Sequence, residues 1–471
     1  MSAHNPALEL TREEMRAFGY RVIDVIVEHL ATLREQPVGA CLPVADLAAA
    51  EGSAPPEDGA PFEEVLEEAL DRALRQTMHV NHPRFFAYVP GPSNYVSVLA
   101  DTLAAAFNTF AGTWISGSGA AVMERTVIDW LRQLCGFPAT TAGLFVSGGS
   151  MANLTALAAA RNAMLNDETA GAVVYFSDQT HSSVAKSLRV LGFRPEQIRR
   201  IPSGRNWRLP MLELARQAQW DASTGLRPFC VVANAGTTNT GAVDPLADIA
   251  RFCRERNMWM HVDGAYGAAA VIAPRGRELL AGMDEADSLS LDPHKWLFQP
   301  FETGCVMVRD GSLLRHTFEV VPEYLRDTHQ RSGELNLADY GVQLTRGFRA
   351  LKLWMSLRVF GLASFREAIA RGFRAAEFAE ACVREQDGWE IVSPAQMGIV
   401  CFRYIHGDDA FHQRLVQEIV ADGYALVTST ILGGRTVLRM CPINPRSTEE
   451  DIRSTLARID GLVVRVARRM T

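Results

Sequence analysis

Lysine is scarce in this chain. Of its 47 lysines and arginines only three are lysines, at positions 186, 295 and 352. Arginine cannot stand in for lysine as an amine nucleophile, because its guanidinium group stays protonated at neutral pH. Any reaction that uses an amine side chain therefore has three candidates: Lys186, Lys295 and Lys352.

Several other features are missing. No unbroken apolar stretch reaches the roughly 18 residues that span a bilayer, and the first residues lack the basic start and apolar core of a signal peptide. The eight cysteines include no CxxC pair, which favours reduced, mostly buried thiols over disulfides or metal ligands. With a formal net charge of -7 and no basic run, nothing favours a nucleic-acid or membrane partner. We expect a cytoplasmic protein with a small-molecule partner and no metal.

Common catalytic motifs are absent too. The sequence contains no HExxH, no GxSxG, no GxxxxGK[ST] and no GxGxxG after a predicted strand. Zinc proteases, serine hydrolases, P-loop enzymes and dinucleotide-binding enzymes are therefore not indicated.

The pattern along the chain predicts an α/β protein of two or three units. Thr11 and Glu14 have capping-box spacing before an amphipathic helix, and a second helix is expected over 62–78. Between about His82 and Asp310, short β-rich runs alternate with helical stretches, which predicts a mainly parallel sheet covered by helices on both faces.

The last third of the chain predicts a smaller α/β unit. A long helix begins near Leu351, a further helix is expected over 409–422, and a final helix ends the chain. Strands are expected at 398–405, 424–430 and 435–441. The predicted division is a helical arm at 1–81, a large domain at 82–350 and a small domain at 351–471.

A glycine-rich turn at Ser147, Gly148, Gly149 and Ser150 lies between a strand and a helix. Such a turn directs free backbone N–H groups and the positive end of the helix dipole to one point, which suits a phosphate. A simple tight turn with a serine cap explains the same residues equally well.

Three further side chains follow predicted strands. Asp263 ends an apolar strand, where a carboxylate can keep a pyridine nitrogen protonated. Lys295, beside His294, follows another apolar strand, and partial burial there makes a lysine a usable nucleophile. His181 follows a third strand and can stack on a ring or move a proton. Each has a structural explanation alone, but together they place a phosphate turn, a histidine, an acid and a lysine at the strand ends of one sheet.

These residues lie in motifs that resemble the group II pyridoxal 5'-phosphate (PLP) dependent decarboxylases, of the aspartate-aminotransferase fold (fold type I). The likeness is strongest to aromatic L-amino acid decarboxylases. It runs through HPRFFAYVP (82–90), SDQTHSSV, GTTNTGAVD (236–244), HVDGAY, DPHKW, EYLRDTHQRSG (323–333) and GFRALKLW (347–354). The resemblance implies removal of the α-carboxylate from an amino acid by a homodimer with shared active sites.

The resemblance also implies a role for each site residue. Lys295 would carry the cofactor as a Schiff base, Asp263 would pair with the pyridine nitrogen, and Tyr324 would return a proton to the substrate. The remaining cofactor-binding residues implied are Gly148, Gly149 and Ser150 at the phosphate, His181 and Ala265 on the two ring faces, Thr237, Asp292 and His294.

The substrate is less well specified. Tyr88, Pro90, Phe301 and Thr345 occupy positions that imply an apolar pocket for an aromatic or large aliphatic side chain. Asp292 stands where asparagine is common, and Gly91 and Gly112 stand where bulkier residues are common. Three alternatives stay open: an oxidative aldehyde synthase, a decarboxylase of acidic or sulfinic amino acids with an arginine in its pocket, and a cofactor-fold protein without turnover.

Overall fold

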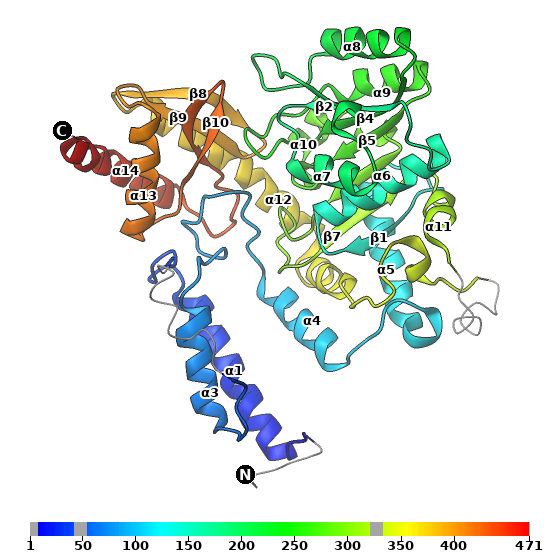
Figure 1. The fold of residues 1–471 in the computed structure, drawn as a ribbon. Coiled ribbons are helices and arrows are strands. Elements are labelled where there is room, and N and C mark those ends of the chain that lie inside the picture. Colours follow the sequence, from blue (N-terminus) through cyan, green and yellow to red (C-terminus); the bar gives the residue numbers. More distant parts are fainter. Residues whose placement is uncertain (1–7, 42–53, 321–332, 471) are drawn as a thin grey trace.

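A seven-stranded sheet forms the centre of the protein in the computed structural model, which describes residues 8–41, 54–320 and 333–470 (Figure 1). Its strand order is β1-β7-β6-β5-β4-β2-β3. The strands are β1 (Ala142–Val146), β2 (Ala172–Ser177), β3 (Ile198–Ile201), β4 (Arg227–Asn234), β5 (Trp259–Asp263), β6 (Ser288–Leu291) and β7 (Gly304–Val308). Only β7 runs against its neighbours, so the prediction of a mainly parallel sheet is confirmed.

Helices cover both faces of this sheet because its strands are apolar on both sides. In β2, Val173 and Tyr175 belong to one buried cluster, while Val174 and Phe176 belong to the other. The first cluster is closed by α5 (Trp114–Leu134), α8 (Met211–Ser223) and α9 (Leu246–Glu255). The second is closed by α6 (Gly149–Leu165), α7 (Ser182–Val190) and α11 (Ser312–Phe318). This arrangement is the two-layered covering that near-continuous apolar strands require.

The last part of the chain forms a smaller antiparallel sheet, ordered β10-β11-β9-β8. Its strands are β8 (Trp389–Gln396), β9 (Ile399–Tyr404), β10 (Thr428–Leu432) and β11 (Arg435–Met440). It packs against α12 (Ala350–Arg384), α13 (Asp409–Asp422) and α14 (Glu449–Met470). The strand predicted over 424–430 enters the sheet only at Thr428, and β8 had no counterpart in the prediction.

The first helices stand away from the two sheets (Figure 1). The predicted capping box at Thr11 begins α1 (Arg12–Thr32). The second helix is shorter than predicted, because α3 (Phe62–Ala69) gives way to a π-helical turn at Leu70–Leu74. Phe18 and Phe62 stack at 4.1 Å between ring centroids, and no residue of α1 is buried.

Short elements complete the described chain: α4 (Tyr95–Ala106), α10 (Pro274–Leu279), and 3-10 turns at Pro195–Gln197, Gly267–Ile272, Met283–Glu285 and Leu337–Tyr340. Across the described ranges, no helix combines the length and the apolarity needed to cross a bilayer.

Candidate active site

The predicted site residues meet where five strands end. Because β1, β2, β4, β5 and β6 point the same way, their carboxyl ends share one edge of the sheet, where ligands of such sheets bind. A cavity of about 350 Å³ opens there. It is lined by every cofactor-binding residue predicted from the sequence: Gly148, Gly149, Ser150, His181, Thr237, Asp263, Ala265, Asp292, His294 and Lys295.

Lys295 reaches this cavity from the turn after β6. Its Nζ lies 2.9 Å from Oδ2 of Asp292, and about a quarter of its side chain is exposed. Asp292 is buried, its Oδ2 also lies 3.5 Å from Nε2 of His294, and its Oδ1 has no hydrogen-bond partner within the described part of the chain. Burial lowers the pKa of His294, so its imidazole is neutral near pH 7. Asp292 thus provides the negative charge that holds the Lys295 amine.

Asp263 is held by hydrogen bonds alone. Its Oδ1 accepts from the Ala265 backbone N–H and from Ser290 Oγ, each at 3.2 Å, and its Oδ2 accepts from Asn153 Nδ2 at 3.0 Å. It forms no ion pair among the described residues. A buried carboxylate that is oriented but not neutralised favours a cationic ligand group, such as a protonated pyridine nitrogen.

His181 caps the N-terminus of α7 at the mouth of the cavity. Its Nδ1 lies 2.8 Å from Ser183 Oγ and accepts from the Ser183 backbone N–H at 3.3 Å. Desolvation lowers the pKa of the imidazole, although Asp263 opposes the shift. The ring is therefore neutral at pH 7 while its outer side stays exposed.

The glycine-rich turn packs tightly against the ends of β5 and β6. A Cβ on Gly149 would lie 2.8 Å from the Ala265 Cβ and 2.9 Å from Asp292 Oδ2, which is too close for any side chain. Helix α6 starts at Gly149, so the N–H groups of Gly149 and Ser150 lie beside the cavity, whereas those of Met151 and Ala152 donate to the Gly148 carbonyl. This geometry suits an anion such as a phosphate.

The predicted substrate-pocket residues do not line this cavity. Tyr88, Phe301 and Thr345 are exposed and Pro90 is buried nearby. The Phe301 ring lies edge-on to His294, with 5.1 Å between the ring centroids. Their role in binding substrate remains a prediction, and Tyr324 lies outside the described residues.

Sequence reasoning missed several residues that line the cavity: Asn153, Ser183, Asn234, Gly236, Thr238, Tyr266 and Glu302. Asn153 and Ser183 directly contact predicted site residues, as described above. Their positions in the first turns of helices that follow strand ends were the available signal. Their side-chain types alone gave no reason to select them.

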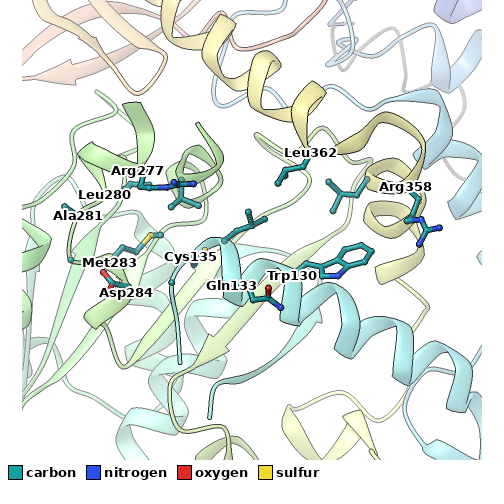
Figure 2. A pocket seen from close by; sticks show the side chains of 15 residues that line it. Trp130, Gln133, Cys135, Arg277, Leu280, Ala281, Met283, Asp284, Arg358 and Leu362 are labelled. Atoms are coloured by element: carbon teal, nitrogen blue, oxygen red, sulfur yellow. The ribbon is translucent and has the colours of Figure 1, made fainter. Parts of the chain in front are cut away.

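A larger cavity, of about 970 Å³, does not carry comparable chemistry (Figure 2). Its lining comes from the end of α5, from α12 and from residues 271–284, and contains no lysine or histidine. Cys135 is its one thiol, and burial raises the pKa of that thiol to about 12, so it stays protonated. Cavity size is therefore a poor guide to function in this protein.

The smaller cavity fits PLP in three independent respects. It offers a lysine amine, an oriented carboxylate without an ion-pair partner, and a glycine turn at a helix N-terminus. A parallel α/β sheet with this set of groups defines the class of enzymes that use PLP.

Comparisons with known proteins agree with this class. The family described as "Pyridoxal-dependent decarboxylase conserved domain" matches residues 45–405. The chain is 46% identical over 468 residues to an aromatic-L-amino-acid decarboxylase of Bacillus atrophaeus, with 98% of each protein covered. It is 31% identical to a phenylacetaldehyde synthase of Arabidopsis thaliana, covering 93% of each. The crystal structure of Oryza sativa TDC with PLP and tryptamine superposes with a TM-score of 0.91 at 32% identity, covering 98% of this chain and 99% of that one.

This chain therefore belongs to the pyridoxal-dependent decarboxylase family. The prediction of a PLP-dependent decarboxylase, made from the sequence motifs, is confirmed, and so is the cofactor.

Proposed function

We propose that this enzyme removes the α-carboxylate of an aromatic L-amino acid and releases the amine and CO2. The observation that carries the substrate class is the near-full-length match to the aromatic-L-amino-acid decarboxylase of Bacillus atrophaeus. Tryptophan, tyrosine, phenylalanine and DOPA are the candidate substrates.

The proposed roles follow from the geometry of the cavity. When bound, PLP supplies an electron sink for the pair of electrons that remains after CO2 leaves. Lys295 would supply the amine that holds the cofactor, and Asp263 would keep positive charge on the ring nitrogen. The first turn of α6, with Gly149 and Ser150, would hold the phosphate, and His181 would contact the ring.

Lys295 provides the direct test of this assignment. Borohydride treatment of the PLP-loaded enzyme should attach the cofactor irreversibly to Lys295, as read by peptide mass. Lys295→Ala should lose this adduct completely but keep measurable PLP binding, because the phosphate site is intact. Lys186→Ala is the matched control and should retain the adduct. An adduct on another lysine would contradict the assignment.

Product analysis tests the reaction. The wild-type enzyme, supplied in turn with the aromatic amino acids, should release CO2 and amine in equal amounts without consuming oxygen. Acidic and sulfinic amino acids should react much more slowly. Release of CO2 only from acidic substrates would overturn the substrate class.

An oxidative aldehyde synthase is the second candidate, favoured by the likeness to the phenylacetaldehyde synthase of Arabidopsis thaliana. We prefer decarboxylation because the chain has both His181 and the tyrosine at 324 that we propose as proton donor. Tyr324→Phe should keep PLP bound while diverting part of the product to aldehyde. Oxygen uptake by the wild-type enzyme that matches substrate consumption would establish the oxidative reaction instead.

We also propose that the enzyme is a homodimer in which the arm at 1–81 contributes to the interface of the domains at 82–350 and 351–471. Helix α1 buries none of its residues within one chain and leaves Met15, Tyr20 and Val27 exposed. Large apolar side chains that stay exposed on a helix are typical of an oligomer interface. Sedimentation should give twice the chain mass, and Tyr20→Glu should shift it towards the monomer.

We place this dimer in the cytoplasm. All eight cysteines are free, and seven of them are buried. That composition suits a reducing compartment.

A further inference from the structure

A chain of hydrogen bonds runs beneath the cavity, and Asn153 lies at its centre. Its side chain is buried on α6. Its Nδ2 lies 2.9 Å from Ser183 Oγ and 3.0 Å from Asp263 Oδ2, and its Oδ1 lies 2.9 Å from His261 Nε2. Both amide protons and the amide oxygen are therefore used.

The donor and the acceptor of each hydrogen bond can be assigned by starting at Trp259. The indole N–H of Trp259 can only donate, and it lies 2.8 Å from Ser288 Oγ. The Ser288 hydroxyl accepts this bond and can donate its own proton to Nδ1 of His261, at 2.9 Å. Burial lowers the pKa of His261 to about 4, so the ring is neutral and carries a single proton. With Nδ1 accepting, that proton lies on Nε2 and is donated to the Asn153 oxygen.

The contact with Asp263 indicates the same donors and acceptors for the Asn153 amide. An ionised carboxylate can only accept, so the group of Asn153 that faces it at 3.0 Å must be the amide nitrogen. Reversing the amide would bring its oxygen against the carboxylate and its nitrogen against the His261 N–H. The Asp263 contact therefore fixes the orientation of Asn153, and the contacts of His261 agree with it.

The orientation of the Asn153 amide also bears on the position of the His181 proton. The second amide proton of Asn153 goes to Ser183 Oγ, which leaves the Ser183 hydroxyl proton for Nδ1 of His181 at 2.8 Å. The Ser183 backbone N–H also donates to this nitrogen. The single proton of the neutral His181 ring is then on Nε2.

We propose that Asn153 is a positioning residue of this active site, whose amide joins the Asp263 carboxylate to the His181 imidazole and places the protons of His261 and His181 on Nε2. His181 then offers an N–H donor at the cavity, suited to an anionic oxygen such as a substrate carboxylate. As a neutral ring it does not accept a proton at Nε2. The substrate carboxylate as the acceptor of the His181 N–H rests on the proposed function, whereas the proposed proton positions do not.

The proton positions can be measured in protein free of cofactor. Nitrogen NMR of 15N-histidine-labelled apoprotein distinguishes the two neutral forms of each ring, with His181→Gln and His261→Gln to assign the signals. In the wild type at pH 7.5, both rings should carry the proton on Nε2. Finding either ring with its proton on Nδ1 would overturn the proposal.

Two variants separate the role of Asn153 from that of Ser288. In Asn153→Leu, His261 loses the acceptor of its Nε2–H, so its proton should move wholly or partly to Nδ1. In Ser288→Ala, Asn153 and Asp263 still fix the direction, so the proton should stay on Nε2. The reverse pattern would overturn the proposal. If Asn153→Leu does not fold, the position of the His261 proton in Ser288→Ala alone tests the proposal.

Cofactor affinity gives a second measurement. Asn153→Leu removes one hydrogen bond to the Asp263 carboxylate, which should weaken PLP binding by about tenfold or more. Asn162→Leu is the matched control on the same helix, where the amide bonds only the exposed Asp167, and should leave the affinity within about twofold of the wild type. Equal affinities in the two variants would overturn the role at Asp263. Absence of decarboxylation would refute the proposed function but would leave these measurements unaffected.

Discussion

A buried ion pair behind the phosphate turn offers a sharp test of how the site is supported. Glu124 on α5 and Arg346 are both almost fully buried, and Nη2 of Arg346 lies 2.5 Å from Oε1 of Glu124. The same Oε1 accepts from the Phe145 N–H at 2.8 Å, and Arg346 donates to the Phe145 carbonyl at 2.7 Å. The pair therefore fixes both backbone groups of Phe145, in the strand that leads to the glycine turn.

Removing both partners should cost less than the sum of the two single losses. Glu124→Gln keeps the shape and one oxygen acceptor but leaves Arg346 as a buried cation without a counter-ion, at a cost of about 3–5 kcal/mol of unfolding free energy. Arg346→Met leaves the carboxylate unpaired and also removes the bonds to the carbonyls of Phe145 and Ala111, so it should cost at least as much. The double variant should be more stable than the sum of the two losses predicts, by about 1–3 kcal/mol.

Chemical unfolding of the cofactor-free variants at one protein concentration measures these differences. PLP affinity should fall together with stability, because β1 positions the phosphate turn. Glu390→Gln is the control, since its 3.0 Å pair with Arg435 is exposed and should be worth less than about 1 kcal/mol. A cost of Glu124→Gln as small as that of Glu390→Gln, or strictly additive losses in the double variant, would refute the reasoning.

Two further perturbations follow from the site. Gly149→Ala places a methyl group 2.8 Å from the Ala265 Cβ, so the turn must shift and PLP affinity, measured by fluorescence titration, should fall about tenfold or more. Gly119→Ala has open space around it and should bind PLP normally; equal affinities in the two variants would show that the turn is not the phosphate site. The pKa of His261 is lowered to about 4 from 6.5, so the unfolded chain binds a proton there that the folded chain does not. The free energy of unfolding should therefore fall by on the order of 3 kcal/mol because of this ring as pH falls from 6.5 to 4. Above pH 6.5 the ring should have no effect, and the decrease should disappear in His261→Gln.

The parts of the fold that could be predicted are those in which the local pattern and the final structure agree. The strands β2, β4 and β5 are mostly apolar, and β6 alternates serine with leucine, so their segments were recognisable without knowledge of their neighbours. Strand β3 was missed because two of its four residues, Arg199 and Arg200, interrupt the apolar pattern at the edge of the sheet. Strand β7 was missed because it follows β6 without an intervening helix and runs antiparallel to it.

The candidate site also contains residues that could be predicted from the sequence and residues that could not. Asp263 and Lys295 could be found because Asp263 ends strand β5 and Lys295 lies in the turn after β6, and parallel strands bring their carboxyl ends together whatever the rest of the chain does. The number of lysines narrowed the choice further, since only three residues in the chain could supply an amine.

Asn153 could not be found in this way, because its role depends on residues distant in sequence. Its hydrogen-bond partners Ser183, His261 and Asp263 lie 30, 108 and 110 residues further along the chain. No rule of sequence spacing relates such positions. They are brought together by the packing of α6 against the sheet. An amide can face either way, and here the surrounding donors and acceptors accommodate only one orientation. The sequence thus locates the charged groups of the site, whereas the proposed proton positions around them depend on tertiary contacts, and we expect replacement of Asn153 to alter those positions without changing any charged residue.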